Sequence, residues 1–227
     1  MKELRVYKSN QLIEAGYKLS LMEQRLILTA IAQVDSRENI YPKISVTATQ
    51  FASTYGMDLK NAYVELREAA DALYERDIRY LDDKGSDTRV RWLFKRDYNN
   101  GEGSITLHLT PDIIPYLSQL KRNFTGYNLN NIAKLSSSYS IRLYELSKQY
   151  QPLKEREMSL QFLYSRLELS GAYSRFSNLK ARVLEPALEE INLHTDIFVD
   201  YEVIRKGKTP TSIILNITQN PQQQLPL

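Results

Sequence analysis

The feature that most constrains the fold is an order of elements that occurs twice along the chain. Each half contains a helical pattern, a short helical pattern, a longer helical pattern and then the alternating apolar residues that are typical of strands. A helix-turn-helix followed by a β-hairpin is a winged helix, so the sequence predicts an α+β fold with two tandem winged-helix domains. Two unrelated α+β domains are the alternative. The helical ranges are 17–34, 49–55 and 59–76 in the first half, and 139–150, 159–169 and 174–192 in the second.

Local signals support these helices. Ser20 and Glu23 have the S-x-x-E spacing of a capping box, and Asp58 is placed to cap the helix at 59–76. Gly56 is the usual residue at the end of a helix. Apolar residues of the two halves also align at an offset of 118 residues, which favours a repeat. The aligned pairs are Phe51 with Leu169, Tyr55 with Tyr173, Leu66 with Leu184, Ala69 with Ala187, Leu73 with Ile191 and Tyr80 with Phe198.

We expect the two domains to meet near residue 131. A helix is predicted from Thr110 to Arg122, because Pro111 stands at its start, where proline is favoured. The sequence GYNLNN at 126–131 then indicates a connection. The expected domains are 1–131 and 132–218, and the Pro- and Gln-rich residues 219–227 are expected to be disordered.

Few residues of the chain could support catalysis. It has no Cys and only two His, His108 and His194, which are far apart. We therefore expect no disulfide, no metal site, no cofactor and no enzymatic activity. The sequence GKT at 207–209 resembles the end of a P-loop, but Glu202 occupies the position of the required earlier glycine. No run of about 18 apolar residues is present, so we expect a cytoplasmic protein without membrane contact.

The two longer helices differ in charge, and this difference indicates which half reads DNA. Residues 174–183 contain three basic residues and no acid, whereas the helix at 59–76 carries four acids. The net charge of +3 permits nucleic acid as a partner, and a recognition helix usually enters the major groove with its N-terminal part. At about 100° per residue, one apolar face turns inward and the basic face turns outward, the inward residues being Phe176, Leu179, Val183 and Ala187. We predict that this helix contacts DNA through Arg175, Ser177, Asn178, Lys180, Ala181 and Arg182.

These residue types fit base recognition. Arg and Lys pair with guanine, Asn pairs with adenine, and a small Ala allows close approach to a thymine methyl group. The turn at 205–208 adds three cations at a hairpin tip, and we predict that Lys206 and Lys208 contact phosphates or the minor groove. Plain solvation of this charged turn is the alternative. In the first half, Lys84, Arg89 and Arg91 are weaker candidates for phosphate contacts, because aspartates are interspersed among them.

Two stretches of the chain resemble the iteron-binding plasmid replication initiators, the Rep family. The first is LSLMEQRLILTAIAQV at 19–34, preceded by Asn10, Leu12, Ala15 and Tyr17. The second comprises LSSSYSIRLYEL at 135–146, RFSNLKARVLEPALEEINLHTD at 175–196 and the KGK wing. Together they extend the resemblance over nearly the whole chain.

The resemblance implies a bacterial initiator that acts on plasmid DNA in the cytoplasm, associated with the plasmid or the nucleoid. In this family the C-terminal domain carries the main DNA-reading helix, and the N-terminal domain supplies dimerisation and auxiliary DNA contacts. Monomers bind directly repeated iterons at the origin and help to open it, while dimers bind an inverted operator repeat and repress the initiator gene. Host replication proteins, namely the host initiator and helicase, are the implied further partners. The resemblance also implies that Ser136 and Ser138 contact phosphates.

Two other functions remain open at this point. A dimeric winged-helix transcriptional repressor would use the same DNA-reading helix without initiator activity. An interaction scaffold would bind no DNA, and it would therefore lack the salt-dependent binding that phosphate contacts produce.

Overall fold

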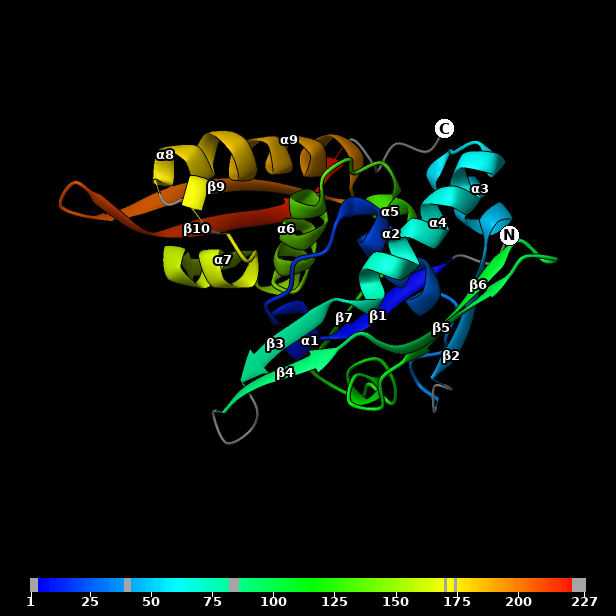
Figure 1. The fold of residues 1–227 in the computed structure, drawn as a ribbon. Coiled ribbons are helices and arrows are strands. Elements are labelled where there is room, and N and C mark those ends of the chain that lie inside the picture. Colours follow the sequence, from blue (N-terminus) through cyan, green and yellow to red (C-terminus); the bar gives the residue numbers. More distant parts are fainter. Residues whose placement is uncertain (1–3, 39–41, 82–85, 170, 174, 222–227) are drawn as a thin grey trace. The chain divides into compact units, whose positions relative to one another are not determined.

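The computed structural model describes residues 4–38, 42–81, 86–169, 171–173 and 175–221 (Figure 1). The chain divides into two compact units, Met1–Lys134 and Leu135–Leu227. This division falls three residues after the boundary that the sequence suggested. Each unit contains helices and a three-stranded antiparallel sheet, in agreement with the predicted α+β class.

The first unit is built on a sheet in which β6 (Ser104–Leu109) lies between β2 (Lys43–Thr47) and β5 (Leu93–Asn99). Trp92 lies fully buried just before β5. Two further strand pairs complete the unit, together with a 3-10 turn at Ile114–Tyr116. The strand pairs are β1 (Arg5–Ser9) with β7 (Phe124–Asn128) and β3 (Asp77–Leu81) with β4 (Asp87–Arg91). The helices are α1 (Asn10–Ile13), α2 (Leu21–Ile31), α3 (Ala48–Tyr55), α4 (Leu59–Tyr74) and α5 (Asn130–Ala133).

The predicted caps are present in this unit. The Ser20 hydroxyl accepts a hydrogen bond from the Glu23 N–H at 3.2 Å, and the Glu23 carboxylate accepts one from the Ser20 N–H. Asp58 accepts from the first N–H groups of α4, and Gly56 ends α3 at a φ of 65°. Arg76 pairs with the buried Glu23 at 2.8 Å, so the capping carboxylate also ties the end of α4 to α2.

Two predictions for residues 110–131 are wrong. The helix expected at 110–122 is a single 3-10 turn, after which Gln119 and Asn123 adopt positive φ angles of 52° and 53°. The segment at 126–131, expected to be a connection, contains the end of strand β7, which pairs with β1 near the start of the chain, and the beginning of α5. At Gly126 a side chain would collide with the ring of Tyr7, because a Cβ atom there would lie 2.4 Å from Tyr7 Cε1. Because β1 and β7 are more than 100 residues apart, no pattern of neighbouring residues indicates that they pair.

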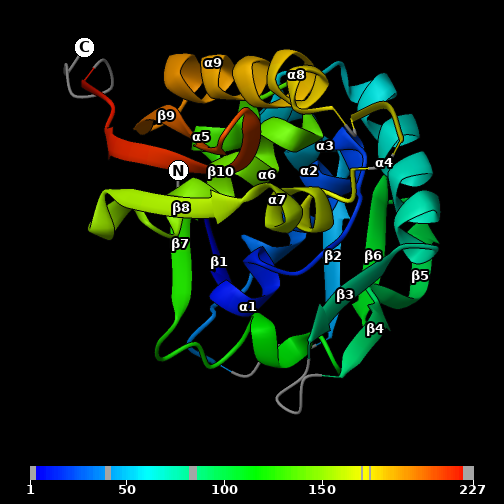
Figure 2. The same ribbon diagram turned by 90° about the vertical axis from the view of Figure 1, so that its left-hand side faces the viewer.

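The second unit repeats the sheet topology of the first. Its order is β8 (Glu155–Ser159), β10 (Thr209–Gln219) and β9 (Ile197–Lys206), so in both sheets the strand that comes last in sequence lies in the centre. Helix α6 (Ser138–Lys148) precedes β8, and α7 (Leu160–Arg166) follows it directly (Figure 2). A third helical segment, residues 176–194, lies along the β9–β10 hairpin (Figure 1). The same order and topology in both units confirm the two winged helices.

The alignment of the halves at an offset of 118 holds only along the longer helix. There the pairs Leu66 with Leu184, Ala69 with Ala187 and Leu73 with Ile191 are buried on both sides. The short helices align differently, since their caps Thr47 and Ser159 stand 112 residues apart, so the buried counterpart of Phe51 is Leu163 and not Leu169. The match of Tyr80 with Phe198 is also wrong, because Tyr80 belongs to the additional β3–β4 hairpin and Phe198 to β9.

The start of the predicted disordered tail is ordered. Gln219 ends strand β10, and Asn220 is buried. The Asn220 side-chain amide donates to the carbonyl oxygens of Asn192 at 2.7 Å and Thr195 at 2.9 Å, which attaches the end of the sheet to the end of the last helix. Residues 222–227 of the expected tail lie outside the described residues.

Replacing Asn220 by Ala tests this attachment. The substitution leaves two carbonyl groups without their donor, so we expect the free energy of unfolding to fall by about 1–3 kcal/mol. Urea denaturation of the full chain measures the change. The control is Gln219→Ala, whose side chain is exposed and should matter by less than about 0.5 kcal/mol. Equal stability of the two variants would contradict the role given to Asn220.

Candidate nucleic-acid interface

The segment that the sequence predicts as one regular helix contains a wider turn. Helix α8 (Phe176–Leu179) runs into a π turn (Lys180–Leu184), which continues as α9 (Glu185–His194). The Glu185 N–H donates to the Lys180 carbonyl, five residues back instead of four. Pro186 has no N–H, and in a regular helix its ring would clash with the Arg182 carbonyl. The wider turn before Pro186 avoids this clash. Ser174, the expected first residue of this helix, lies outside the described residues.

The buried and exposed residues of the π turn form two separate runs. Val183 and Leu184 are both buried. Lys180, Ala181 and Arg182, immediately before them, are all exposed. Three consecutive residues of the turn therefore face outward.

The predicted DNA-facing residues of this segment are brought together on one surface. Arg175 and Ser177 are exposed, as are the three residues of the π turn named above, whereas Asn178 is half-buried and Phe176, expected to be inside, is half-buried as well. Leu179 is buried beneath them and anchors α8. The wheel of a regular helix thus places most of these residues correctly.

The cations of this surface differ in their partners. Within the part of the chain that the structure describes, the guanidinium groups of Arg175 and Arg182 make no ion pair or hydrogen bond. Lys180 is different, because its Nζ lies 3.3 Å from Glu185 Oε1. This hydrogen bond to Glu185 is the main cause that raises the pKa of Lys180 above its usual value.

At the wing tip, residues 205–208 of the β9–β10 hairpin, the cations also differ in whether they have a partner. Arg205, Lys206 and Lys208 are exposed around Gly207, which has a φ of 62°. The Arg205 guanidinium donates to the Lys208 carbonyl at 3.2 Å, while the ammonium groups of Lys206 and Lys208 form no ion pair with any described residue. The hairpin tip and α8 lie at the same end of the second unit (Figures 1 and 2). The second unit thus presents two sets of exposed cations at one end.

Ser136 and Ser138, which the resemblance implies as phosphate contacts, are not both free to bind a phosphate. The Ser136 hydroxyl and N–H both donate to the carboxylate of Glu190, the N–H at 3.2 Å, so a phosphate at this position would have to displace Glu190. Ser137 caps α6 by accepting from the Tyr139 N–H, and Ser138 is half-buried at the first position of α6. Sequence reasoning missed Glu190, because 54 residues separate it from Ser136.

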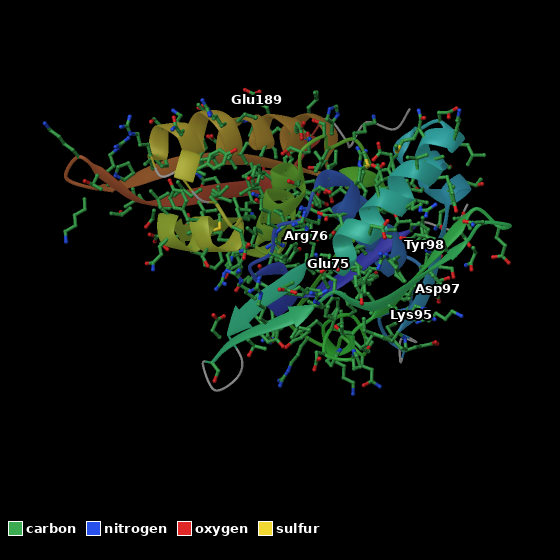
Figure 3. The ribbon with its side chains drawn as sticks, in the orientation of Figure 1. Glu75, Arg76, Lys95, Asp97, Tyr98 and Glu189 are labelled. Atoms are coloured by element: carbon green, nitrogen blue, oxygen red, sulfur yellow. The ribbon has the colours of Figure 1, made fainter. Side chains whose placement is uncertain are left out.

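In the first unit the corresponding cations are engaged in ion pairs. Arg89 lies 2.6 Å from Asp77, and Arg91 lies 3.1 Å from Glu75, so both candidate phosphate contacts have carboxylate partners. Lys84 lies outside the described residues. On β5, Lys95 pairs with Asp97 (Figure 3), and Arg96 pairs with Asp71 of α4. These cations of the first unit therefore have carboxylate partners, whereas Arg175 and Arg182 of the second unit have none among the described residues.

The described residues offer no group of three His, Cys, Asp or Glu that could hold a metal ion. His108, one of the two histidines, lies 2.8 Å from Asp97 across the sheet of the first unit. None of the helices that the structure describes combines the length and the apolar character needed to cross a bilayer.

Comparison with known proteins identifies similar sequences and folds. The family model described as "Initiator Replication protein, WH1" matches residues 5–148, and the model described as "Initiator Rep protein, WH2" matches residues 159–217. A "Replication initiation protein" from Escherichia coli is 29% identical over 99% of this chain and 73% of its own length. The "PI protein" from Escherichia coli is 26% identical over 90% of this chain and 79% of its own length.

A solved structure shares the fold of the whole chain. It is described as "Crystal structure of Pi initiator protein in complex with iteron DNA", and it matches with a TM-score of 0.83 and 24% sequence identity. The match covers 97% of this chain and 99% of the other. Because the identity is low, this likeness establishes the fold only. The DNA contacts of this chain have to be argued from its own residues.

Proposed function

We propose that this chain, which belongs to the initiator replication protein family, starts plasmid replication by binding repeated sites, or iterons, in double-stranded origin DNA. The observation that carries the proposal is the exposed cationic start of the 176–194 segment, with the wing tip at the same end of the unit. The Pi initiator, which has the same fold, was crystallised with iteron DNA, and this supports the choice of ligand.

The exposed residues suggest how the second unit reads DNA. Arg182 and Arg175 have guanidinium groups without a carboxylate partner among the described residues, so they can form bidentate hydrogen bonds with guanine. Ala181 lies between Lys180 and Arg182 and is small enough for the π turn to approach the base edges. Lys206 and Lys208 at the wing tip can neutralise phosphates, which supplies affinity without sequence preference.

The proposed action needs no bond-making chemistry. Binding energy at several adjacent iterons would distort the origin and help to open it, after which the host initiator and helicase are recruited. We further propose that dimers, formed through the first unit, bind an inverted operator repeat and repress the initiator gene. All these steps take place in the bacterial cytoplasm, on the plasmid.

Plasmid maintenance distinguishes this function from that of a dimeric repressor without initiator activity. The gene is expressed in trans to a replicon that carries only the origin repeats and a selectable marker. An initiator supports stable replication of this replicon. A repressor binds its site and silences its promoter, yet the replicon is lost.

Arg182→Ala tests the base contact. If the guanidinium reads guanine, the substitution should weaken binding to the specific site by about 1–3 kcal/mol and relax the base preference at one position. Fluorescence anisotropy on the specific site, on single-base variants and on random DNA measures both effects. Arg182→Lys is the matched control, because it keeps the charge and loses the bidentate fork. An equal loss on specific and random DNA would reveal a phosphate contact instead.

Lys206→Ala tests the wing. Losing one phosphate contact should weaken binding to all sequences alike and reduce the slope of log K against log salt by about 0.9. Titrations at several salt concentrations give this slope, and Lys206→Arg should retain the wild-type value. A slope that does not change with Lys206→Ala would remove the wing from the DNA interface.

A further inference from the structure

Glu185 is the first acid that follows the basic start of the 176–194 segment. Its Oε1 atom lies 3.3 Å from Lys180 Nζ and 3.5 Å from the hydroxyl of Tyr201, which belongs to strand β9. The side chains of Lys180 and Glu185 are 45% and 44% exposed, so the pair lies at the edge of the proposed DNA surface and not in the core. Lys180 is thus the one cation of the segment's exposed set that has a carboxylate partner among the described residues.

The π turn is the reason that these two side chains meet. In a regular helix, side chains three or four residues apart are neighbours, and side chains five apart point in different directions. The wider turn makes residues five apart neighbours, as the hydrogen bond from the Glu185 N–H to the Lys180 carbonyl shows. Lys180 and Glu185 are therefore joined twice, through the main chain and through the side chains.

We propose that Glu185 withholds Lys180 from DNA phosphates and so lowers the number of phosphates that the recognition helix neutralises. This inference rests on the proposed DNA-binding function. A phosphate that approaches Lys180 must compete with a carboxylate already in contact with the ammonium group, while Arg175 and Arg182 offer no such competition. Lys180 is charged at neutral pH, as an ordinary lysine is, and the contact with Glu185 raises its pKa further.

The expected consequence is weaker binding to DNA of any sequence. Each neutralised phosphate contributes about 0.9 to the slope of log K against log salt, so a withheld lysine lowers the slope by that amount. At 0.1 M salt this corresponds to about an eightfold lower affinity. Glu185 thus limits the time that the protein spends on DNA outside its sites.

Glu185→Gln tests the proposal, and Glu189→Gln is the matched control. Both substitutions remove one negative charge from α9, but Glu189 lies on the outer side of the helix (Figure 3) and forms no ion pair within the described residues. Binding to a random-sequence duplex is measured by fluorescence anisotropy over a range of salt concentrations, on the full chain. We expect Glu185→Gln to steepen the slope by about 0.9 and to raise the affinity at 0.1 M salt by about eightfold, and Glu189→Gln to leave the slope unchanged.

Substitution of the lysine in both backgrounds completes the test. Lys180→Met should lower the slope less in the wild-type chain, where Glu185 holds the ammonium group, than in the Glu185→Gln background. In the Glu185→Gln background we expect the substitution to lower the slope by about 0.9. Equal slopes for Glu185→Gln and Glu189→Gln, or an equal effect of Lys180→Met in the two backgrounds, would overturn the proposal. Failure of the wild-type chain to bind any DNA would instead refute the proposed function, and this inference with it.

Discussion

The main chain before Pro186 is the constraint on which the interface depends. Pro186 has no N–H, and it follows a five-residue turn that a regular helix does not contain. Within this turn, Val183 and Leu184 anchor the segment to the core, while the three residues before them face outward. The same turn brings Glu185 to Lys180. The exposed residues, their anchor and the ion pair therefore lie together in one turn of the main chain.

The two units show that one topology can carry different electrostatics. In both, the last strand of the three-stranded sheet lies in its centre, and a longer helix packs against the core. In the first unit, Arg96 is paired with Asp71 of α4 and Arg91 with Glu75, which follows α4, so both arginines have carboxylate partners within the unit. In the second unit, Arg175 and Arg182 have no such partners among the described residues. The two surfaces therefore differ in whether their arginines have carboxylate partners. The surface of the second unit with Arg175 and Arg182 is the one that can bind DNA phosphates without displacing an acid.

The sequence predicted those features that depend on neighbouring residues. The capping box at Ser20, the cap at Asp58 and the exposed tip around Gly207 follow from short patterns, and the structure contains them all. The pairing of β1 with β7 and the contact of Ser136 with Glu190 join residues that are far apart, so no local pattern announces them. The expectation of a helix at 110–122 rests on a proline at its start, and the positive φ angles at Gln119 and Asn123 show that the chain turns there instead. The π turn was missed because a helical wheel assumes a constant angle per residue.

The position of the last strand in each sheet has a consequence for synthesis on the ribosome. In the second unit β8 and β9 do not pair with each other, since β10 separates them. Until residues 209–219 have left the exit tunnel, the earlier part of this unit has no central strand on which to assemble. The three-stranded sheet of the first unit is completed in the same way, when β6 comes between β2 and β5. The nascent chain therefore completes two folding events in order, and the DNA-reading surface is finished only with the second.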